Sequence, residues 1–203
     1  MFREHIFSVF NEPDVEERLK LVRTQIDPFF EEAIQEVLPI LNGNGETYRA
    51  FIAKHARRHS NPPPNTWVAF AQNKRGYKMV PHYEIGVWDD RLFVWLAFET
   101  NMQERQSAID KLKSKQAGFL NLGAQFKLSN NHMAKSFISL TKENFEKSVK
   151  EYRFQKKAEV LIGRVLQKDN RNLDSKAAVL EMIEQTISVL SKMGLHFLVL
   201  VNN

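Results

Sequence analysis

Two strand-like segments that meet at Asp89-Asp90 constrain the fold of this chain more than any other feature. Residues 77–88 alternate between two faces, and the run Arg91–Phe98 is almost entirely apolar. A pair of turn-forming residues between two such segments is typical of a tight β-hairpin. A third strand-like segment, Trp67–Ala71, precedes them and ends at the turn Asn73-Lys74-Arg75-Gly76. The three segments predict a central antiparallel meander.

The first forty residues have a helical pattern instead. Apolar residues recur every three or four positions from Val15 to Leu41, which indicates one buried helical stripe. Asn11 is expected to cap the first helix, with Pro13 in its first turn. Asp27-Pro28 leaves two alternatives open, one bent helix or two helices that meet at this point. The stripe ends at Asn42-Gly43.

Helices also follow the meander, and short strands lie between them. The expected helices are Met102–Lys115, a helix from Thr141 to about Phe154, and a long helix that Asp174 caps and Gly194 ends. The additional expected strands are Tyr48–His55, Gln125–Leu128, Ser136–Leu140 and Ala158–Leu166. This order is that of an α+β fold, because strands and helices do not alternate regularly. We predict a single α+β domain over residues 1–203, with a mainly antiparallel sheet, a central meander and flanking N-terminal and C-terminal helices.

Composition excludes several classes of protein. Cysteine is absent, which excludes disulfides, thiolate metal sites and a cysteine nucleophile. No apolar run approaches the roughly 20 residues that a membrane helix needs. The longest candidate, residues 195–201, has the length of a buried strand, and whether residues 195–203 form a strand or a helix end stays open. We therefore expect a cytoplasmic protein with no membrane contact, and the sequence leaves its oligomeric state undetermined.

Positive charge is concentrated in one part of the chain. The net charge is +5, yet the interval Thr47–Tyr83 contains seven Lys and Arg residues and no Asp or Glu, so the remaining residues together carry −2. The seven are Arg49, Lys54, Arg57, Arg58, Lys74, Arg75 and Lys78. A local excess of one sign attracts ions of the other. We call this interval, residues 47–83, the basic block.

The basic block predicts an anion-binding module that contacts nucleic acid or a phosphorylated ligand. Arginine and lysine bind phosphate, and exposed aromatic side chains can stack on bases. Neutral histidines could donate to the same ligand. The candidate ligand-binding residues are Lys54, His55, Arg57, Arg58, Trp67, Lys74, Arg75, Tyr77, Lys78 and His82. The alternative is that these cations are solvated and protect sheet edges, with Trp67 and Tyr77 packed in the sheet.

A second hypothesis is a small-molecule enzyme with a pocket around His82 and Glu84 that acts on an acidic substrate. A period of two places His82 and Glu84 on one face of a strand, about 7 Å apart, where they could pair or act as acid and base. His55 and His59 are four residues apart, but their local sequence is not helical, so we predict no metal site. Phosphate-loop, dinucleotide-binding and nucleophile-elbow motifs are missing. We predict no cofactor and assign no catalytic residue.

The middle of the chain also resembles a known family. The distinctive residues run through Ala53-Lys54-His55-Ala56-Arg57-Arg58, Asn61-Pro62-Pro63, Thr66-Trp67-Val68-Ala69-Phe70-Ala71, Lys74-Arg75-Gly76-Tyr77-Lys78-Met79, Pro81-His82 and Ile85-Gly86. This block resembles the YktB-like family of uncharacterised bacterial proteins. The resemblance is concentrated in residues 47–98, and it implies a compact α+β fold in a cytoplasmic bacterial protein. It implies no activity.

Overall fold

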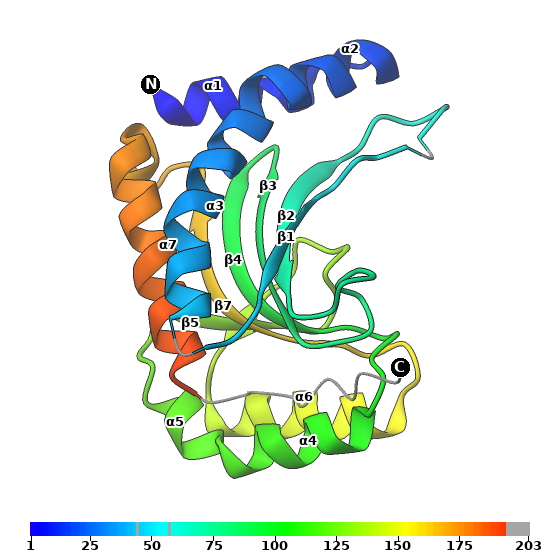
Figure 1. The fold of residues 1–203 in the computed structure, drawn as a ribbon, viewed down its shortest axis with the longest axis vertical. Coiled ribbons are helices and arrows are strands. Elements are labelled where there is room, and N and C mark those ends of the chain that lie inside the picture. The colour runs from blue at the N-terminus through cyan, green and yellow to red at the C-terminus, as the bar shows by residue number, and fades with distance from the viewer. Residues whose placement is uncertain (44, 57, 194–203) are drawn as a thin grey trace.

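The computed structural model describes residues 1–43, 45–56 and 58–193, and one antiparallel sheet organises this part of the chain (Figure 1). The sheet has seven strands in the order β1-β2-β3-β4-β7-β5-β6, and each strand pairs antiparallel with its neighbours. Helices precede and follow the strands along the chain. The predicted α+β class, the antiparallel sheet and its flanking helices are confirmed.

The predicted central meander forms around the hairpin at Asp89-Asp90, and one further strand pairs with each of its two outer strands. The strands are β1 (Arg49–Ile52), β2 (Asn65–Ala71), β3 (His82–Trp88), β4 (Arg91–Phe98), β5 (Phe126–Ser129), β6 (Ile138–Ser139) and β7 (Val160–Gln167). β3 begins at His82, so the strand predicted from residue 77 was too long at its start. Proline cannot donate to a strand ladder, so Pro81 marks this boundary, and Val80 closes a turn onto the carbonyl of Tyr77.

The helices form two groups. The N-terminal elements are α1 (Phe2–Ser8), the 3-10 turn Val9–Asn11, α2 (Val15–Leu21), a π-helical turn Val22–Ile26 and α3 (Asp27–Asn42). The later elements are α4 (Arg105–Ser114), α5 (Gln116–Leu120), α6 (Lys142–Phe154), the 3-10 turn Arg171–Asp174 and α7 (Lys176–Ser191). α3 packs beside α7, and α4 packs beside α6 below the sheet in Figure 1.

Helix starts show where local sequence misled the prediction. Asp14, not Asn11, caps α2, because its Oδ1 accepts hydrogen bonds from the backbone N–H groups of Glu16 and Glu17. Ser175, not Asp174, caps α7, because its Oγ accepts a hydrogen bond from the backbone N–H of Ala178, whereas the Asp174 carboxylate is 2.5 Å from the Arg3 guanidinium. Thr141 caps α6 as predicted. The predicted C-terminal boundary at Gly194 and the segment 195–203 lie outside the described residues.

The two faces of the sheet are buried by different parts of the chain. One face packs against helices, with Val68, Phe70 and Ile85 meeting Phe30 and Ile183 in one apolar cluster. The opposite face has its own apolar cluster of Trp88, Phe93, Trp95, Ala97 and Leu161, against which Trp67, Phe137 and Val165 pack. We call this second side the tryptophan face. Trp88 and Trp95 therefore have the packing role that the alternation predicts.

Candidate functional site

A cluster of titratable side chains lies on the tryptophan face, where β3, β4 and β7 run side by side. His82 pairs with Ala97 across β3 and β4, and Phe98 pairs with Val160 across β4 and β7. Glu99 directly follows β4, and Glu159 directly precedes β7. Side chains two positions apart on a strand share a face, so these carboxylates extend the side of the sheet that carries Ala97 and Leu161.

The inner part of this cluster is fully enclosed. His82, Glu84 and Glu99 have exposed fractions of 0%, 2% and 1%. The Nδ1 atom of His82 is 2.8 Å from the carbonyl oxygen of Val80, which fixes that nitrogen as the donor. The Nε2 atom is 3.3 Å from Oε1 of Glu84 and 3.4 Å from Oε1 of Glu99. We call His82, Glu84 and Glu99 the inner triad.

Electrostatics require a positive charge inside the inner triad. Burial opposes protonation of His82, but hydrogen bonds to Glu84 and Glu99 and the charges of both residues outweigh it, so the pKa of His82 is raised. Burial likewise opposes ionisation of Glu99, yet the hydrogen bond to His82 and its charge lower the pKa of the Glu99 carboxyl. Two carboxylates facing one imidazole nitrogen are stable in a dry interior only with a cation between them.

The second part of the cluster is the outer triad of Glu99, His132 and Glu159. His132 lies in the connection between β5 and β6, and its ring Nδ1 is 2.8 and 2.9 Å from the two Glu159 oxygens. The backbone N–H groups of His132 and Thr100 donate to Glu159 at 2.7 and 3.4 Å. Burial lowers and the carboxylates raise the pKa of His132, with a net increase. The outer triad reaches solvent through His132, whose side chain is 17% exposed.

Both triads have the donors and the spacing of a metal site. In each triad, one donor atom per residue lies within 4.8 Å of the others, and Glu99 belongs to both. Imidazole nitrogen combined with carboxylate oxygen suits zinc, manganese or iron better than calcium or magnesium, which prefer oxygen ligands alone. One oxygen, Oε1 of Glu99, is buried and makes no well-oriented hydrogen bond with the described residues.

Three residues of the basic block form an aromatic path that ends at the inner triad. The Tyr77 ring lies 4.9 Å from the His82 ring, centroid to centroid, and the Tyr77 hydroxyl accepts a hydrogen bond of 2.9 Å from Trp67 Nε1. His55 then packs edge-on against Trp67. Burial and the nearby Arg58 charge lower the pKa of His55 to about 4, so its ring is neutral at neutral pH. Trp67 and Tyr77 thus pack against other rings, and Tyr77 covers the His82 ring of the inner triad.

The cations of the basic block separate into groups. Lys54 and Arg58 follow β1, whereas Lys74 and Arg75 follow β2. Because β1 and β2 are antiparallel, these two groups lie beyond opposite ends of the pair, about 20 Å apart along a strand of this length. In Figure 1 the β1–β2 connection projects away from the β2–β3 connection. The proposed ligand residue Arg57 lies outside the described residues.

A groove of about 890 Å³ runs along β1 and reaches Tyr77. Its polar lining includes Arg23, Asp27, Lys54 and His55. Within the described residues, neither Arg23 nor Lys54 forms an ion pair. Burial and the Glu31 charge, opposed by Arg23, raise the pKa of the Asp27 carboxyl to about 6, so its negative charge in the groove is lost as the pH falls through about 6.

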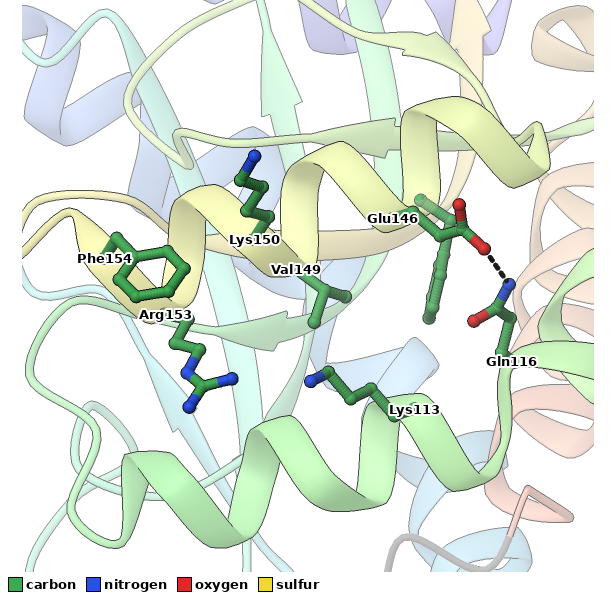
Figure 2. Close-up of a pocket in the computed structure, with 8 residues that line it drawn as sticks. Lys113, Gln116, Glu146, Val149, Lys150, Arg153 and Phe154 are labelled. Carbon is green, nitrogen blue, oxygen red and sulfur yellow. Dashed lines mark hydrogen bonds between the residues drawn. The ribbon is translucent and has the colours of Figure 1, made fainter.

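A second cavity, of about 400 Å³, lies between α4 and α6 and is the one drawn in Figure 2. Lys113 and Arg153 point into the space between the two helices, whereas Lys150 points away. Glu146 accepts a hydrogen bond of 2.9 Å from the amide of Gln116. The cavity is therefore an exposed, positively charged hollow without the paired acids and bases of the buried cluster.

Sequence reasoning found two of the five cluster residues. His82 and Glu84 were expected to be neighbours on one face, and they are in contact. Glu99, His132 and Glu159 were missed, as was the close spacing of donor atoms in the two triads that they form with His82 and Glu84. Strand alternation does predict the side of the sheet on which Glu99 lies, because residues two apart share a face and Glu99 follows Trp95 and Ala97 at that spacing. No comparable signal marks His132, which lies in an irregular connection.

The fold and the cluster define the class of protein: an α+β chain whose antiparallel sheet carries a buried histidine–glutamate cluster on one face. The chain belongs to the family described as Domain of unknown function (DUF1054), whose model matches residues 2–193. The family resemblance predicted from the central block is thereby confirmed and covers nearly all of the described chain. None of the described helices has both the length and the apolar character needed to cross a membrane.

Bacterial relatives match over most of the chain. The UPF0637 protein of Leuconostoc citreum is 41% identical over 172 residues, which cover 84% of this chain and 86% of the relative. The UPF0637 protein of Lacticaseibacillus casei is 36% identical over 193 residues, 95% of each chain. That of Enterococcus faecalis is 35% identical over 174 residues, 84% of each chain. The matches assign a family and no activity.

Proposed function

We propose that this protein binds a divalent transition-metal ion through the inner triad. The observation that carries the proposal is the convergence of three donor atoms, His82 Nε2 and one oxygen each from Glu84 and Glu99, at 3.3 and 3.4 Å. The bond from Nδ1 to Val80 fixes the ring so that Nε2 is the nitrogen that faces the carboxylates. A backbone carbonyl on the second ring nitrogen is the usual support of a metal-ligating histidine.

The buried Oε1 atom of Glu99 adds to this proposal, because it lies 3.4 Å from His82 Nε2 and makes no well-oriented hydrogen bond with the described residues. An unsatisfied carboxylate oxygen in the interior costs several kcal/mol unless a hydrogen bond or a cation compensates it. A metal ion between the three donors would satisfy this oxygen and replace the proton shared by His82 and the carboxylates. Tyr77 covers the His82 ring and would limit the access of water to the ion.

The test is a titration of chelator-treated protein, returned to chelator-free buffer, with Zn²⁺ or Mn²⁺ by isothermal titration calorimetry. We expect uptake of at least one equivalent. His82→Gln and Glu84→Gln should each weaken binding more than about 100-fold, because even the loss of a group that only supports a ligand costs 10–100-fold. The exposed His5 supplies the matched control, His5→Gln, which should bind like the unmodified protein.

Two results would overturn the metal-binding proposal. One is the absence of Zn²⁺ and Mn²⁺ uptake by the unmodified chain. The other is an unchanged affinity in both His82→Gln and Glu84→Gln. Circular dichroism of each variant verifies that weaker binding reflects a lost ligand and not a lost fold.

A second candidate function is binding of a small phosphorylated ligand in the groove along β1. The specific observation in its favour is that Arg23, whose charge acts on Asp27, and Lys54 line this groove with His55, and that neither cation forms a close ion pair with the described residues. The separation of the block's cations favours a ligand of groove size over a continuous nucleic-acid track.

ATP serves as the probe for this second candidate. Lys54→Glu is expected to weaken ATP binding about 10-fold or more, since a charged hydrogen bond contributes about 1.5–3 kcal/mol. Lys113→Glu, in the cavity of Figure 2, is the matched control and should leave binding unchanged. An equal loss of ATP binding in both variants, or no loss in Lys54→Glu, would contradict binding in the groove along β1. Binding of a single-stranded oligonucleotide without ATP binding would favour nucleic acid instead.

A further inference from the structure

We infer that the cluster holds two metal ions, one in each triad, with the Glu99 carboxylate bridging them. The inference rests on the proposed function, because it takes the inner triad as the first metal site. Glu99 supplies a donor atom to both triads, and in each triad the three donor atoms lie within 4.8 Å of one another. A carboxylate has two oxygens and can therefore bind one ion with each.

The outer triad, like the inner one, places an imidazole nitrogen against buried glutamate oxygens. A ring nitrogen of His132 faces the oxygens of Glu159 at 2.8 and 2.9 Å, as Nε2 of His82 faces Glu84 and Glu99. Backbone N–H groups of His132 and Thr100 hold the Glu159 carboxylate in place. Such supporting bonds orient a ligand before the ion arrives.

The negative charge of the three buried glutamates is large enough to bind a second cation. Three glutamates carry −3 when ionised, and all three are almost completely buried, with exposed fractions of 2%, 1% and 3% for Glu84, Glu99 and Glu159. With neutral histidines, one divalent ion leaves the cluster at −1, a charge that either a proton on His132 or a second ion in its place can compensate, and two ions bring the cluster to +1. Buried charge of either sign needs compensation, and two ions leave no pair of carboxylates facing each other without a cation between them.

The two ions would differ in their contact with solvent. His82 is completely buried and Tyr77 covers its ring, whereas the His132 side chain is 17% exposed. An ion in the outer triad can therefore exchange without a large movement of the chain, and it can keep water at an open coordination position. The inner ion would be released slowly, because its three ligands have no such access.

Stoichiometry tests the inference directly. Chelator-treated protein is loaded with Zn²⁺, desalted and measured by inductively coupled plasma mass spectrometry. We expect two ions in the unmodified chain and in His5→Gln, and one ion in His132→Gln and in His82→Gln. Transfer of Zn²⁺ to a colorimetric chelator should show two phases, and His132→Gln should lose the fast one.

A separate measurement tests whether the Glu99 carboxylate bridges the two ions. In Mn²⁺-loaded protein, two ions that share a carboxylate give a spin-coupled electron paramagnetic resonance signal. Glu99→Gln should abolish this coupling, and circular dichroism verifies that the variant keeps its fold. Two uncoupled ions in the unmodified chain would rule out the bridge.

The outcomes separate this inference from the proposed function. Suppose that the unmodified chain binds one ion that is lost in His82→Gln and kept in His132→Gln. That result would overturn the inference of a second ion and leave the proposed function intact. Release of both ions in a single phase would contradict the inferred difference in solvent access between the two triads. No bound ion overturns both proposals.

Discussion

Gly163→Ala is expected to destabilise the protein by about 4 kcal/mol or more, a large part of the roughly 5–15 kcal/mol by which folded proteins are stable. A Cβ atom on Gly163 would lie 1.8 Å from the carbonyl oxygen of Val94 and 2.9 Å from the Trp95 ring. Gly163 pairs with Trp95 at the centre of the sheet. The clash is with the backbone of the neighbouring strand. β4 and β7 would therefore have to separate, and these are the two strands that position Glu99 and Glu159.

Urea unfolding followed by circular dichroism measures the effect of Gly163→Ala. Gly118→Ala is the matched control, because its Cβ would meet only the flexible end of the Met193 side chain, at 3.0 Å. We expect that variant to stay within about 1 kcal/mol of the unmodified protein, since alanine also has the better helix propensity. A Gly163→Ala variant as stable as Gly118→Ala would contradict the close approach of β4 and β7.

The sequence predicts the hairpin well because its signal is local. Alternation, two apolar runs and Asp89-Asp90 occur within a short stretch, and β4 has the bounds Arg91–Phe98 that the pattern predicts. Alternation alone cannot show where β3 begins, since residues 77–81 continue the pattern and yet form a turn. Helix caps fail for a similar reason: several neighbouring polar residues could accept the same hydrogen bonds, and local sequence does not show that Asp174 pairs with Arg3 while Ser175 caps the helix.

The cluster could be predicted only in part because it depends on pairing between distant strands. His82 and Glu84 lie two residues apart, so their proximity follows from the period of a strand. Glu99 and Glu159 meet because β4 pairs with β7, and the register Phe98↔Val160 joins residues far apart in the chain. No local pattern selects β7 as the partner of β4.

The basic block shows the converse limit of sequence reasoning: residues that are neighbours in sequence need not be neighbours in space. Lys54 and Lys74 belong to one acid-free interval, but an antiparallel pair of strands sends the residues beyond its two ends in opposite directions. The histidines of the block also differ: His55 packs against Trp67, whereas His82 is enclosed by two carboxylates. The high density of positive charge in the interval is therefore less informative about a functional site than the contacts of its buried polar residues.

His82→Leu is expected to destabilise the metal-free protein by about 3–5 kcal/mol, the usual cost of removing one partner from a buried ion pair. Leucine cannot supply the positive charge between Glu84 and Glu99, and both carboxylates stay buried, with exposed fractions of 2% and 1%. The measurement is urea unfolding in the presence of EDTA, so that bound metal does not contribute. His5→Leu, at an exposed position, is the control and should change stability by less than about 0.5 kcal/mol.

A second substitution isolates the electrostatic cause. In His82→Leu/Glu84→Gln one of the two facing carboxylates is neutral, so part of the stability lost in His82→Leu should return. Residues in one buried ionic network usually show interaction energies of about 0.5–3 kcal/mol in such a double-mutant cycle. Purely additive effects would mean that His82 acts through packing alone, and a loss below about 1 kcal/mol in the single variant would mean that the carboxylates need no cation. Either result would remove the electrostatic basis for placing a metal ion at this position.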